Sequence, residues 1–324
     1  MKGGDVMTAL YICLSVFISA ILILFAIGYI IFYISARRRR ERPDGFEDTF
    51  RKVKDTDPVK KRLKTDYDWF EGIKKEDITV ISHDGLKLFA ELLRVTDGTP
   101  KGTVILFHGY RSSARRDFCL QIRILHDAGY HVIAVHQRSH KKSEGKYLCY
   151  GLNERRDAIL WVKKAKELFG KDMPLALMGL SMGGATVLMA SGLASKNDPS
   201  LRCVVADCPF SSPWDIISEV VWAKYKIYPY PVMYFTNFWF RVLAKCDLRE
   251  TSSADSAAAS HLPILIFHGD NDTFVLSEHS KKVHKKASLN TKLVLIPDAD
   301  HAQAIFFDEE LYKKELLDFL SEHM

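Results

Sequence analysis

An uncharged apolar run is the first feature of the hydrophobic and polar pattern. From Ala9 to Ile34 the chain carries no charged residue. At 1.5 Å per residue, a helix of this length exceeds the ~30 Å hydrocarbon core of a bilayer. A cleaved signal peptide would have a basic start and a shorter apolar region, whereas four arginines, Arg37 to Arg40, follow this run. The pattern favours a retained transmembrane helix within residues 1–36 over a cleaved signal.

The pattern changes twice after that run. Residues 37–66 are polar, contain two prolines and show no hydrophobic period, which predicts a basic juxtamembrane linker. Residues 67–324 are predicted to form one domain, in which short β-rich apolar segments alternate with segments of helical spacing. Such alternation indicates an α/β protein with a mostly parallel sheet covered by helices on both faces. The predicted strands lie at 78–95 (a hairpin with its turn at Asp84-Gly85), 102–110, 131–139, 174–181, 202–210, 263–272 and 291–301.

One region, at about 211–262, breaks the alternation and shows no clear strand. Residues 214–240 alone hold ten of the 37 aromatic residues of the chain. This composition favours a helical cap over an apolar pocket, and the other interpretation is a satellite core packed on the main domain. The side chains predicted to line the pocket are Trp214, Trp222, Phe235 and Trp239.

The net charge of +6 is located next to the apolar run. Residues 37–64 contain twelve Lys/Arg and six Asp/Glu, so the remainder of the chain is neutral. A neutral domain argues against nucleic-acid binding, which needs basic residues on the folded surface. Positive flanks favour the cytoplasmic side, so we expect a single-pass protein of the cell membrane with a cytoplasmic domain. The same basic cluster is either a contact for anionic lipid headgroups or a topology signal alone.

Cysteine usage is consistent with a reducing compartment. Cys13 lies in the apolar run, the other five cysteines are an odd number, and no C-x-x-C pair occurs. Neither a disulfide framework nor a zinc site is indicated. His136 and His140 are four residues apart but straddle a predicted strand end, so we predict no metal site there. No cofactor is predicted, and nothing in the sequence indicates an oligomeric state.

Ser181 is the first candidate for chemistry. It lies between Gly179 and Gly183, where a predicted strand gives way to a small-residue helix. Small residues allow a helix to pack closely on a sheet, and that is one explanation. The other is a nucleophile on a turn so tight that neighbours with a Cβ would clash.

The ends of two later strands favour the nucleophile. A serine hydroxyl needs a histidine to take its proton, and the histidine needs a carboxylate to orient it. Asp270 and Asp272 follow the penultimate strand, and His301 follows the last one. In a parallel sheet these ends converge on the edge that carries Ser181, in the chain order Ser, Asp, His.

At this point the sequence resembles the α/β-hydrolase superfamily over residues 78–324, and within it the esterase and serine-aminopeptidase branch in a membrane-anchored bacterial form. The resemblance implies Ser181 as nucleophile, His301 as general base and Asp272, three residues after His-Gly, as the orienting acid. It also implies an oxyanion hole formed by the backbone N–H groups of Tyr110 and Met182. The matching motifs are His108-Gly109-Tyr110, Gly179-Leu180-Ser181-Met182-Gly183, and His268-Gly269-x-x-Asp272-x-x-Val275 followed by Asp300-His301.

One loop departs from the family pattern. Where relatives often carry Asp-x-Arg-Gly-His-Gly-x-Ser, residues 136–143 read His-Gln-Arg-Ser-His-Lys-Lys-Ser, with Lys141 in place of a glycine. This departure leaves the triad assignment unaffected, because the loop contributes none of its members.

Taken together, these features predict a membrane-anchored serine hydrolase that cleaves a hydrophobic or lipid-like carboxylic ester. A serine peptidase acting on short peptides is the alternative within the enzyme class. A catalytically silent, membrane-tethered binding protein is the alternative outside it.

Overall fold

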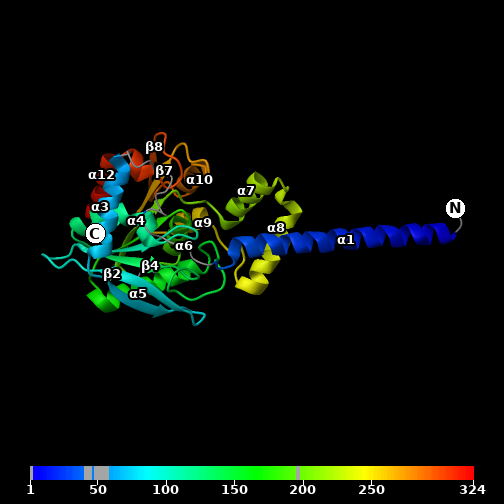
Figure 1. Cartoon of the computed structure of the whole chain (residues 1–324), viewed down its shortest axis with the longest axis horizontal. Coiled ribbons are helices and arrows are strands. Elements are labelled where there is room, and N and C mark those ends of the chain that lie inside the picture. Colours follow the sequence, from blue (N-terminus) through cyan, green and yellow to red (C-terminus); the bar gives the residue numbers. More distant parts are fainter. Residues whose placement is uncertain (1–2, 40–45, 47–57, 195–197) are drawn as a thin grey trace.

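The β-rich segments pair into one eight-stranded sheet with the order β1-β2-β4-β3-β5-β6-β7-β8 (Figure 1). The computed structural model describes residues 3–39, 46, 58–194 and 198–324. The pairs β1–β2 and β2–β4 are antiparallel and all other pairs are parallel, so the predicted fold class is confirmed. The strands are β1 (Glu76–Ile81), β2 (Lys87–Leu93), β3 (Gly102–Phe107), β4 (Tyr130–His136), β5 (Leu175–Leu180), β6 (Leu201–Asp207), β7 (Ile264–Gly269) and β8 (Thr291–Ile296).

Helices cover both faces of this sheet, which is why β3, β4, β5 and β7 are buried along their whole length. Buried side chains of α5, α6, α9 and α10 form one core with the sheet, and those of α3, α4, α11 and α12 form another on the opposite face. These helices are α3 (Pro58–Gly72), α4 (Ala114–Asp127), α5 (Glu154–Phe169), α6 (Met182–Ser191), α9 (Ser253–Ala259), α10 (Glu278–Lys286), α11 (Ala304–Phe307) and α12 (Glu309–His323).

The apolar N-terminal run forms α1 (Gly3–Ala36), which projects from the globular part as a long rod (Figure 1). Its stretch Val6–Ala36 is long and apolar enough to cross a membrane. The last turns of this helix are packed inside the protein, because Phe32 and Ala36 are fully buried. The sequence predicted a separate anchor that ends at residue 36. In the structure, the C-terminal turns of this helix are instead part of the folded domain.

The predicted insertion is helical and lies between β6 and β7. It contains α7 (Pro213–Tyr225), α8 (Pro229–Trp239) and a short π-helix, η1 (Phe240–Ala244), before α9 returns to the sheet. Helix α8 runs beside α1 (Figure 1), and a Cβ on Gly28 would lie 2.7 Å from Cβ of Phe235. This close approach allows α1, the cap helices and α6 to share a third hydrophobic core. We call α7, α8 and η1 the cap.

The predicted linker needs a correction at its C-terminal end. Helix α3 begins at Pro58, inside the segment 37–66, whereas residues 40–45 and 47–57 lie outside the described part. Leu63, Tyr67 and Phe70 are spaced i, i+4, i+7 and are buried, so α3 presents one apolar face to the domain. Lys61, Arg62 and Lys64 are exposed on the same helix, and their charges make this period hard to recognise in the sequence.

Candidate active site

Ser181 lies at the turn between β5 and α6, at the carboxyl end of the sheet. Its backbone has φ 55° and ψ −114°, a strained conformation for a residue with a Cβ. A Cβ on Gly179 would lie 2.1 Å from the carbonyl oxygen of Gly183, and one on Gly183 would lie 1.8 Å from that of Phe107. Both glycines are therefore required by the backbone packing of a tight turn, as their spacing predicts.

His301 stands between Ser181 and Asp272. Its Nε2 lies 3.0 Å from Ser181 Oγ, and its Nδ1 lies 2.7 Å from Asp272 Oδ2. Ser181 and Asp272 are buried, whereas His301 is partly exposed. The three side chains come from the ends of β5, β7 and β8, so the structure brings together the three residues that the sequence singled out.

Asp272 is held in its charged form. Burial alone would raise the pKa of this carboxyl group, but hydrogen bonds from His268 and His301 outweigh burial and hold the pKa well below its usual range. The backbone amides of Phe274 and Val275 also donate to Oδ1, at 2.9 and 2.8 Å. A fixed negative charge at this point favours a proton on Nδ1 of His301, which leaves Nε2 free to accept the proton of Ser181.

The alternative candidate Asp270 and the neighbouring Asp300 form hydrogen bonds within the loops instead. Asp270 Oδ1 accepts a hydrogen bond from the amide of Asp298 at 2.7 Å. Asp300 Oδ1 accepts one from the amide of Thr273 at 2.9 Å. These bonds tie the loop after β7 to the loop after β8, and so they hold Asp272 and His301 in register.

The loop after β3 carries Tyr110 and lies close to the N-terminus of α6, where Met182 is the first residue, since a Cβ on Gly109 would lie 3.5 Å from Cβ of Ser181. Asp117, in the first turn of α4, fixes this loop: its Oδ2 accepts from the amide of Gly109 at 2.6 Å and its Oδ1 from Ser112 Oγ at 2.5 Å. Sequence reasoning missed Asp117, because an acidic residue in the first turn of a helix is common for local reasons.

A cavity of about 420 Å³ opens over Ser181. Apolar and basic side chains share its walls, and Asp117 is the one carboxylate among the described residues that line it. The basic side chains on these walls include Arg111 and Lys141, and the apolar and aromatic ones include Tyr110, Leu148 and Phe274.

Known proteins resemble this arrangement. Residues 98–228 match the family described as serine aminopeptidase, S33. The esterase Pf2001 of Pyrococcus furiosus superposes with a TM-score of 0.61 at 23% identity, covering 82% of this chain and 94% of that one. The chain therefore has the α/β-hydrolase fold.

Two curated relatives extend the comparison. The uncharacterized protein YqkD of Bacillus subtilis is 23% identical over 273 residues, which cover 83% of this chain and 88% of YqkD. The lysophosphatidylserine lipase ABHD12 of Danio rerio is 25% identical over 199 residues, which cover 59% of this chain and 48% of that lipase.

The four aromatic residues predicted to line the pocket lie outside the cavity over Ser181, and that prediction is corrected. Trp239 donates from Nε1 to the carbonyl oxygen of Phe25 at 3.1 Å, and the ring of Phe235 packs edge-on against the same phenylalanine. Trp214 donates to the hydroxyl of Tyr230 at 3.0 Å, and Trp222 is 52% exposed on α7. Phe235 and Trp239 thus cover α1, and Trp214 covers a neighbouring turn of the cap, because the C-terminal part of α1 offers the cap an apolar partner.

The end of α1 is instead tied to the loops around the cavity. Tyr110 donates from its hydroxyl to the carbonyl oxygen of Ser35 at 2.7 Å. Arg111 donates from Nη2 to the carbonyl oxygens of Ile34 and Arg37, at 2.7 and 3.1 Å. These bonds satisfy carbonyl groups that the end of a helix leaves unpaired, and the arginine charge is favourable at that end.

The opposite wall of the cavity is tied to the same helix end. Arg38 donates to the carbonyl oxygens of Lys141 and Ser143, at 2.6 and 2.8 Å. Lys141, the residue that departs from the family pattern, has φ 47°, so its backbone keeps the left-handed conformation that a glycine would adopt freely.

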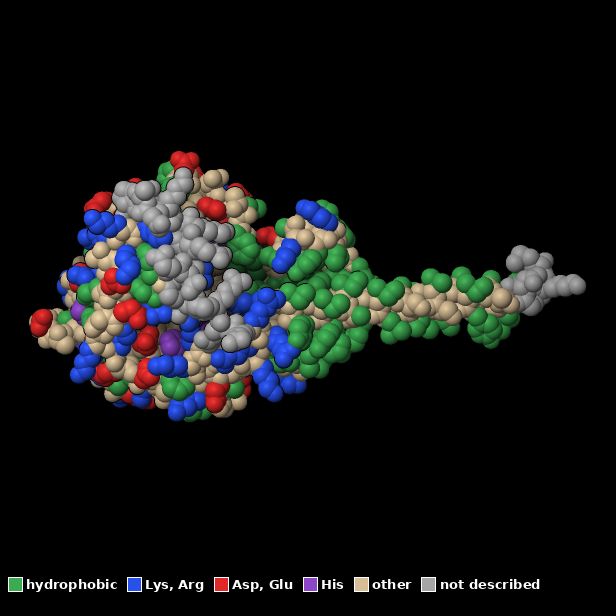
Figure 2. All heavy atoms as spheres, viewed as in Figure 1, with side chains coloured by type: hydrophobic (Ala, Val, Ile, Leu, Met, Phe, Trp, Pro, Cys, Tyr) green, Lys and Arg blue, Asp and Glu red, His purple; other side chains and the backbone are tan. Residues whose placement is uncertain are grey.

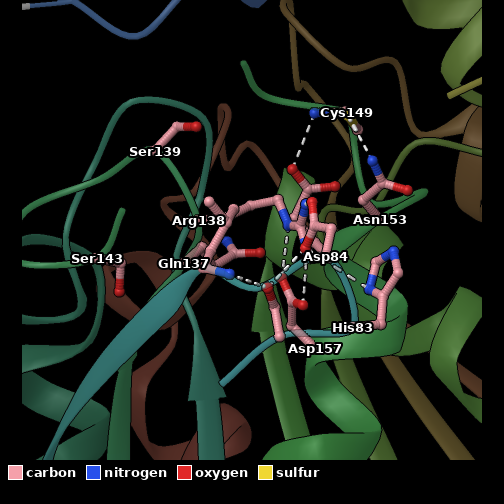
Figure 3. A network of polar contacts seen from close by, with 12 residues as sticks. His83, Asp84, Gln137, Arg138, Ser139, Ser143, Cys149, Asn153 and Asp157 are labelled. Atoms are coloured by element: carbon pink, nitrogen blue, oxygen red, sulfur yellow. Dashed lines mark hydrogen bonds and ion pairs between the residues drawn. The ribbon is translucent and has the colours of Figure 1, made fainter. Parts of the chain in front are cut away.

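Arg138 belongs to this second loop and joins it to neighbouring elements (Figure 3). Its guanidinium bonds both carboxylate oxygens of buried Asp157, at 2.6 and 2.8 Å, and also contacts Asp84 in the β1–β2 turn. Burial would raise the pKa of Asp84, but the bond from Arg138 lowers it to about 2. The loop is therefore held to α5 and to the β1–β2 turn by charge-assisted bonds.

Among the described residues, one group has potential metal-ligand atoms close together, namely Cys208, Asp272 and His301. Two of its members are the carboxylate and imidazole already bonded to each other. Burial raises the pKa of the Cys208 thiol well above its usual range, which keeps the sulfur protonated and a poor ligand. The group is therefore best described as the site of Ser181, His301 and Asp272 with a buried thiol beneath it.

Proposed function

We propose that this protein is a serine hydrolase that cleaves a carboxylic ester through an acyl-enzyme intermediate. The observation that carries the proposal is the position of His301, whose two ring nitrogens lie within hydrogen-bond distance of Ser181 Oγ and Asp272 Oδ2. The strained backbone of Ser181 supports it, since nucleophiles of this fold lie on such turns.

In the proposed reaction Ser181 Oγ attacks the acyl carbonyl carbon while its proton passes to Nε2 of His301. The backbone N–H groups of Tyr110 and Met182 stabilise the negative oxygen that forms. His301 then gives the proton to the leaving alcohol, and the acyl group stays on Ser181. A water molecule, deprotonated by His301, releases the carboxylic acid and restores the serine.

An ester is favoured over the amino end of a peptide by the charge of the cavity. An aminopeptidase must bind the ammonium group of its substrate, for which a carboxylate is the natural partner. Asp117 is the one carboxylate on the described walls, and it already accepts bonds from Gly109 and Ser112. The esterase Pf2001 and the lysophosphatidylserine lipase ABHD12 support the same choice by similarity.

We further propose that α1 anchors the enzyme in a membrane and that the ester carries a hydrophobic acyl chain. The length and apolar character of Val6–Ala36 support the anchor. Leu148 and Phe274 on the cavity wall support the apolar chain. A cytoplasmic location of the catalytic domain remains a prediction from the charges that follow α1.

Fluorophosphonate labelling of the full chain in detergent, followed by mass spectrometry, tests the proposal. We expect one adduct on Ser181 and its loss in Ser181→Ala, together with a fall in ester turnover of at least about 10⁴-fold. Ser191→Ala is the matched control on the same helix, since Ser191 is buried and bonds the carbonyl oxygen of Leu188.

A folded Ser181→Ala protein that retains wild-type turnover would falsify the assignment. An equal loss of turnover in the Ser191→Ala control would show that the serine substitutions act on folding and not on the nucleophile.

A further inference from the structure

The cap presents a continuous aromatic surface to solvent. Tyr228, Tyr230, Tyr234 and Phe238 are between 44% and 69% exposed. The three tyrosine rings are in contact, since the centroids of Tyr228 and Tyr230 are 6.2 Å apart and those of Tyr230 and Tyr234 are 6.0 Å apart. Phe238 borders the same surface hollow as Tyr234. We call these four residues the aromatic face. A contiguous exposed surface of this kind marks an interaction site.

The packing of α1 shows where a bilayer would end. From Val6 to Ile23 every residue of α1 is exposed, and burial against the cap begins at Leu24 and Phe25. Eighteen helical residues span about 27 Å, close to the thickness of the hydrocarbon core. A bilayer that covers the exposed part of α1 therefore ends at the level where α8 lies against that helix.

We propose that the aromatic face binds the interface of the bilayer that α1 crosses, so that the protein has a second, peripheral membrane contact. This inference rests on the membrane anchor proposed above. The cap lies at the base of the rod, and its apolar surface continues that of α1 (Figure 2).

The chemistry of the aromatic face fits a lipid interface better than a protein partner. Tyrosine is enriched at the headgroup level because its ring is apolar and its hydroxyl group is polar. Exposed cations flank the face, with Lys224 and Lys226 at the end of α7 and Arg241 and Lys245 in and after η1. Such cations attract the anionic headgroups of a membrane.

The proposed contact sets the height of the active site. Tyr110 is bonded to Ser35, ten residues after Phe25, which places the loop after β3 about 15 Å further along α1. Because the headgroup region of one leaflet is only about 5–8 Å thick, the cavity would then lie on the aqueous side of the headgroups, above the surface of the membrane.

Site-specific fluorescent labelling of the full chain in vesicles of phosphatidylcholine and phosphatidylglycerol tests this contact. Cys13 is exposed on α1 and the other five cysteines are buried, so the native chain offers one accessible thiol. In a Cys13→Ser background, Phe238→Cys and Tyr228→Cys report on the aromatic face. Leu289→Cys is the matched control, because Leu289 is also apolar and is fully exposed in the turn before β8.

We expect the label on Cys13 to be quenched by lipids that carry a nitroxide deep in the acyl chain. The labels at positions 228 and 238 should be quenched by nitroxides near the headgroup. They should also be severalfold less accessible to aqueous iodide than the label at position 289.

A protected Cys13 label with iodide-accessible labels at both 228 and 238 would overturn the second contact and leave the anchor intact. Protection from iodide without quenching by lipid nitroxides would also overturn it, because the face would then be covered by a second copy of the chain. An iodide-accessible Cys13 label would overturn the anchor itself. Each outcome is separate from ester turnover, which tests the proposed function.

Discussion

The edge of the sheet and the junction of α1 with the cap are linked through the loop after β3 but are built by different interactions. At the sheet edge, tight turns and short polar bonds fix single atoms, such as Nε2 of His301 at 3.0 Å from Ser181 Oγ. At the junction, aromatic rings and buried aliphatic groups fill space around Phe32 and Gly28. Polar bonds are directional and packing is not, so a change at the edge should affect rate and a change at the junction should affect stability.

The largest expected effect comes from the orienting carboxylate. Asp272→Asn should lower turnover by roughly 10⁴-fold, because the amide favours the wrong tautomer of His301. Since the pKa of Asp272 is held well below its usual range, its carboxylate stays ionised from pH 5 to pH 9. The loss in the variant should therefore be present at every pH in that range, as steady-state rates at each pH would measure.

Asp270→Asn is the matched control for that prediction, because Asp270 bonds Asp298 and not His301. Equal losses in the two variants would mean that both carboxylates act through loop structure. The sheet edge would then not differ from the junction in the way described above.

An intermediate effect is expected at the junction of α1 with the cap. Phe32 is fully buried, and its ring meets Phe240 edge-on with centroids 5.0 Å apart. Phe32→Ala should lower the free energy of unfolding by about 3–5 kcal/mol. Thermal unfolding of the full chain in detergent would measure this loss.

Phe17→Ala on the exposed part of α1 makes the same chemical change outside the protein core. Its unfolding temperature should match that of the wild type. If the two variants unfold alike, the end of α1 is not part of the folded domain.

The smallest expected effects are on kcat/KM, and they distinguish a residue of the cavity wall from a residue of the cap. Phe274 lines the cavity and packs against the ring of His301, so Phe274→Ala should lower kcat/KM for a short soluble ester by about tenfold. Trp222→Ala removes a larger ring that lies outside the cavity, and kcat/KM should stay within about twofold of wild type. A larger loss in the tryptophan variant would restore the sequence-based prediction that the cap aromatics line the pocket.

The sheet edge could be predicted because its information is local. Gly179 and Gly183 are required by the backbone of a single turn, and each polar candidate directly follows a β-rich run. The parallel sheet then brings the ends of those runs together without further knowledge of the packing. Asp117 was not predicted, because its hydrogen bond with Gly109 joins two elements and no local sequence pattern indicates that these elements lie close together.

The junction could not be predicted from aromatic content, because composition indicates burial but does not identify the partner. A transmembrane helix is assumed to face lipid on all sides, whereas α1 turns Phe25 and Gly28 toward the cap. One signal was present in the sequence. The uncharged run from Ala9 to Ile34 exceeds the roughly 20 residues that a bilayer requires, and the surplus is the part that the cap covers.

The bonds of Arg38 and Arg111 to the end of α1 have a consequence for how such an enzyme finds its substrate. A catalytic domain on a flexible tether tumbles and samples many orientations above a surface. A domain fixed to its helix has one orientation, so with α1 in a membrane, as proposed above, the direction of the cavity is set once, when the helix inserts. In that arrangement the search for substrate is lateral diffusion within the plane of the membrane, and collisions in that plane replace encounters from solution.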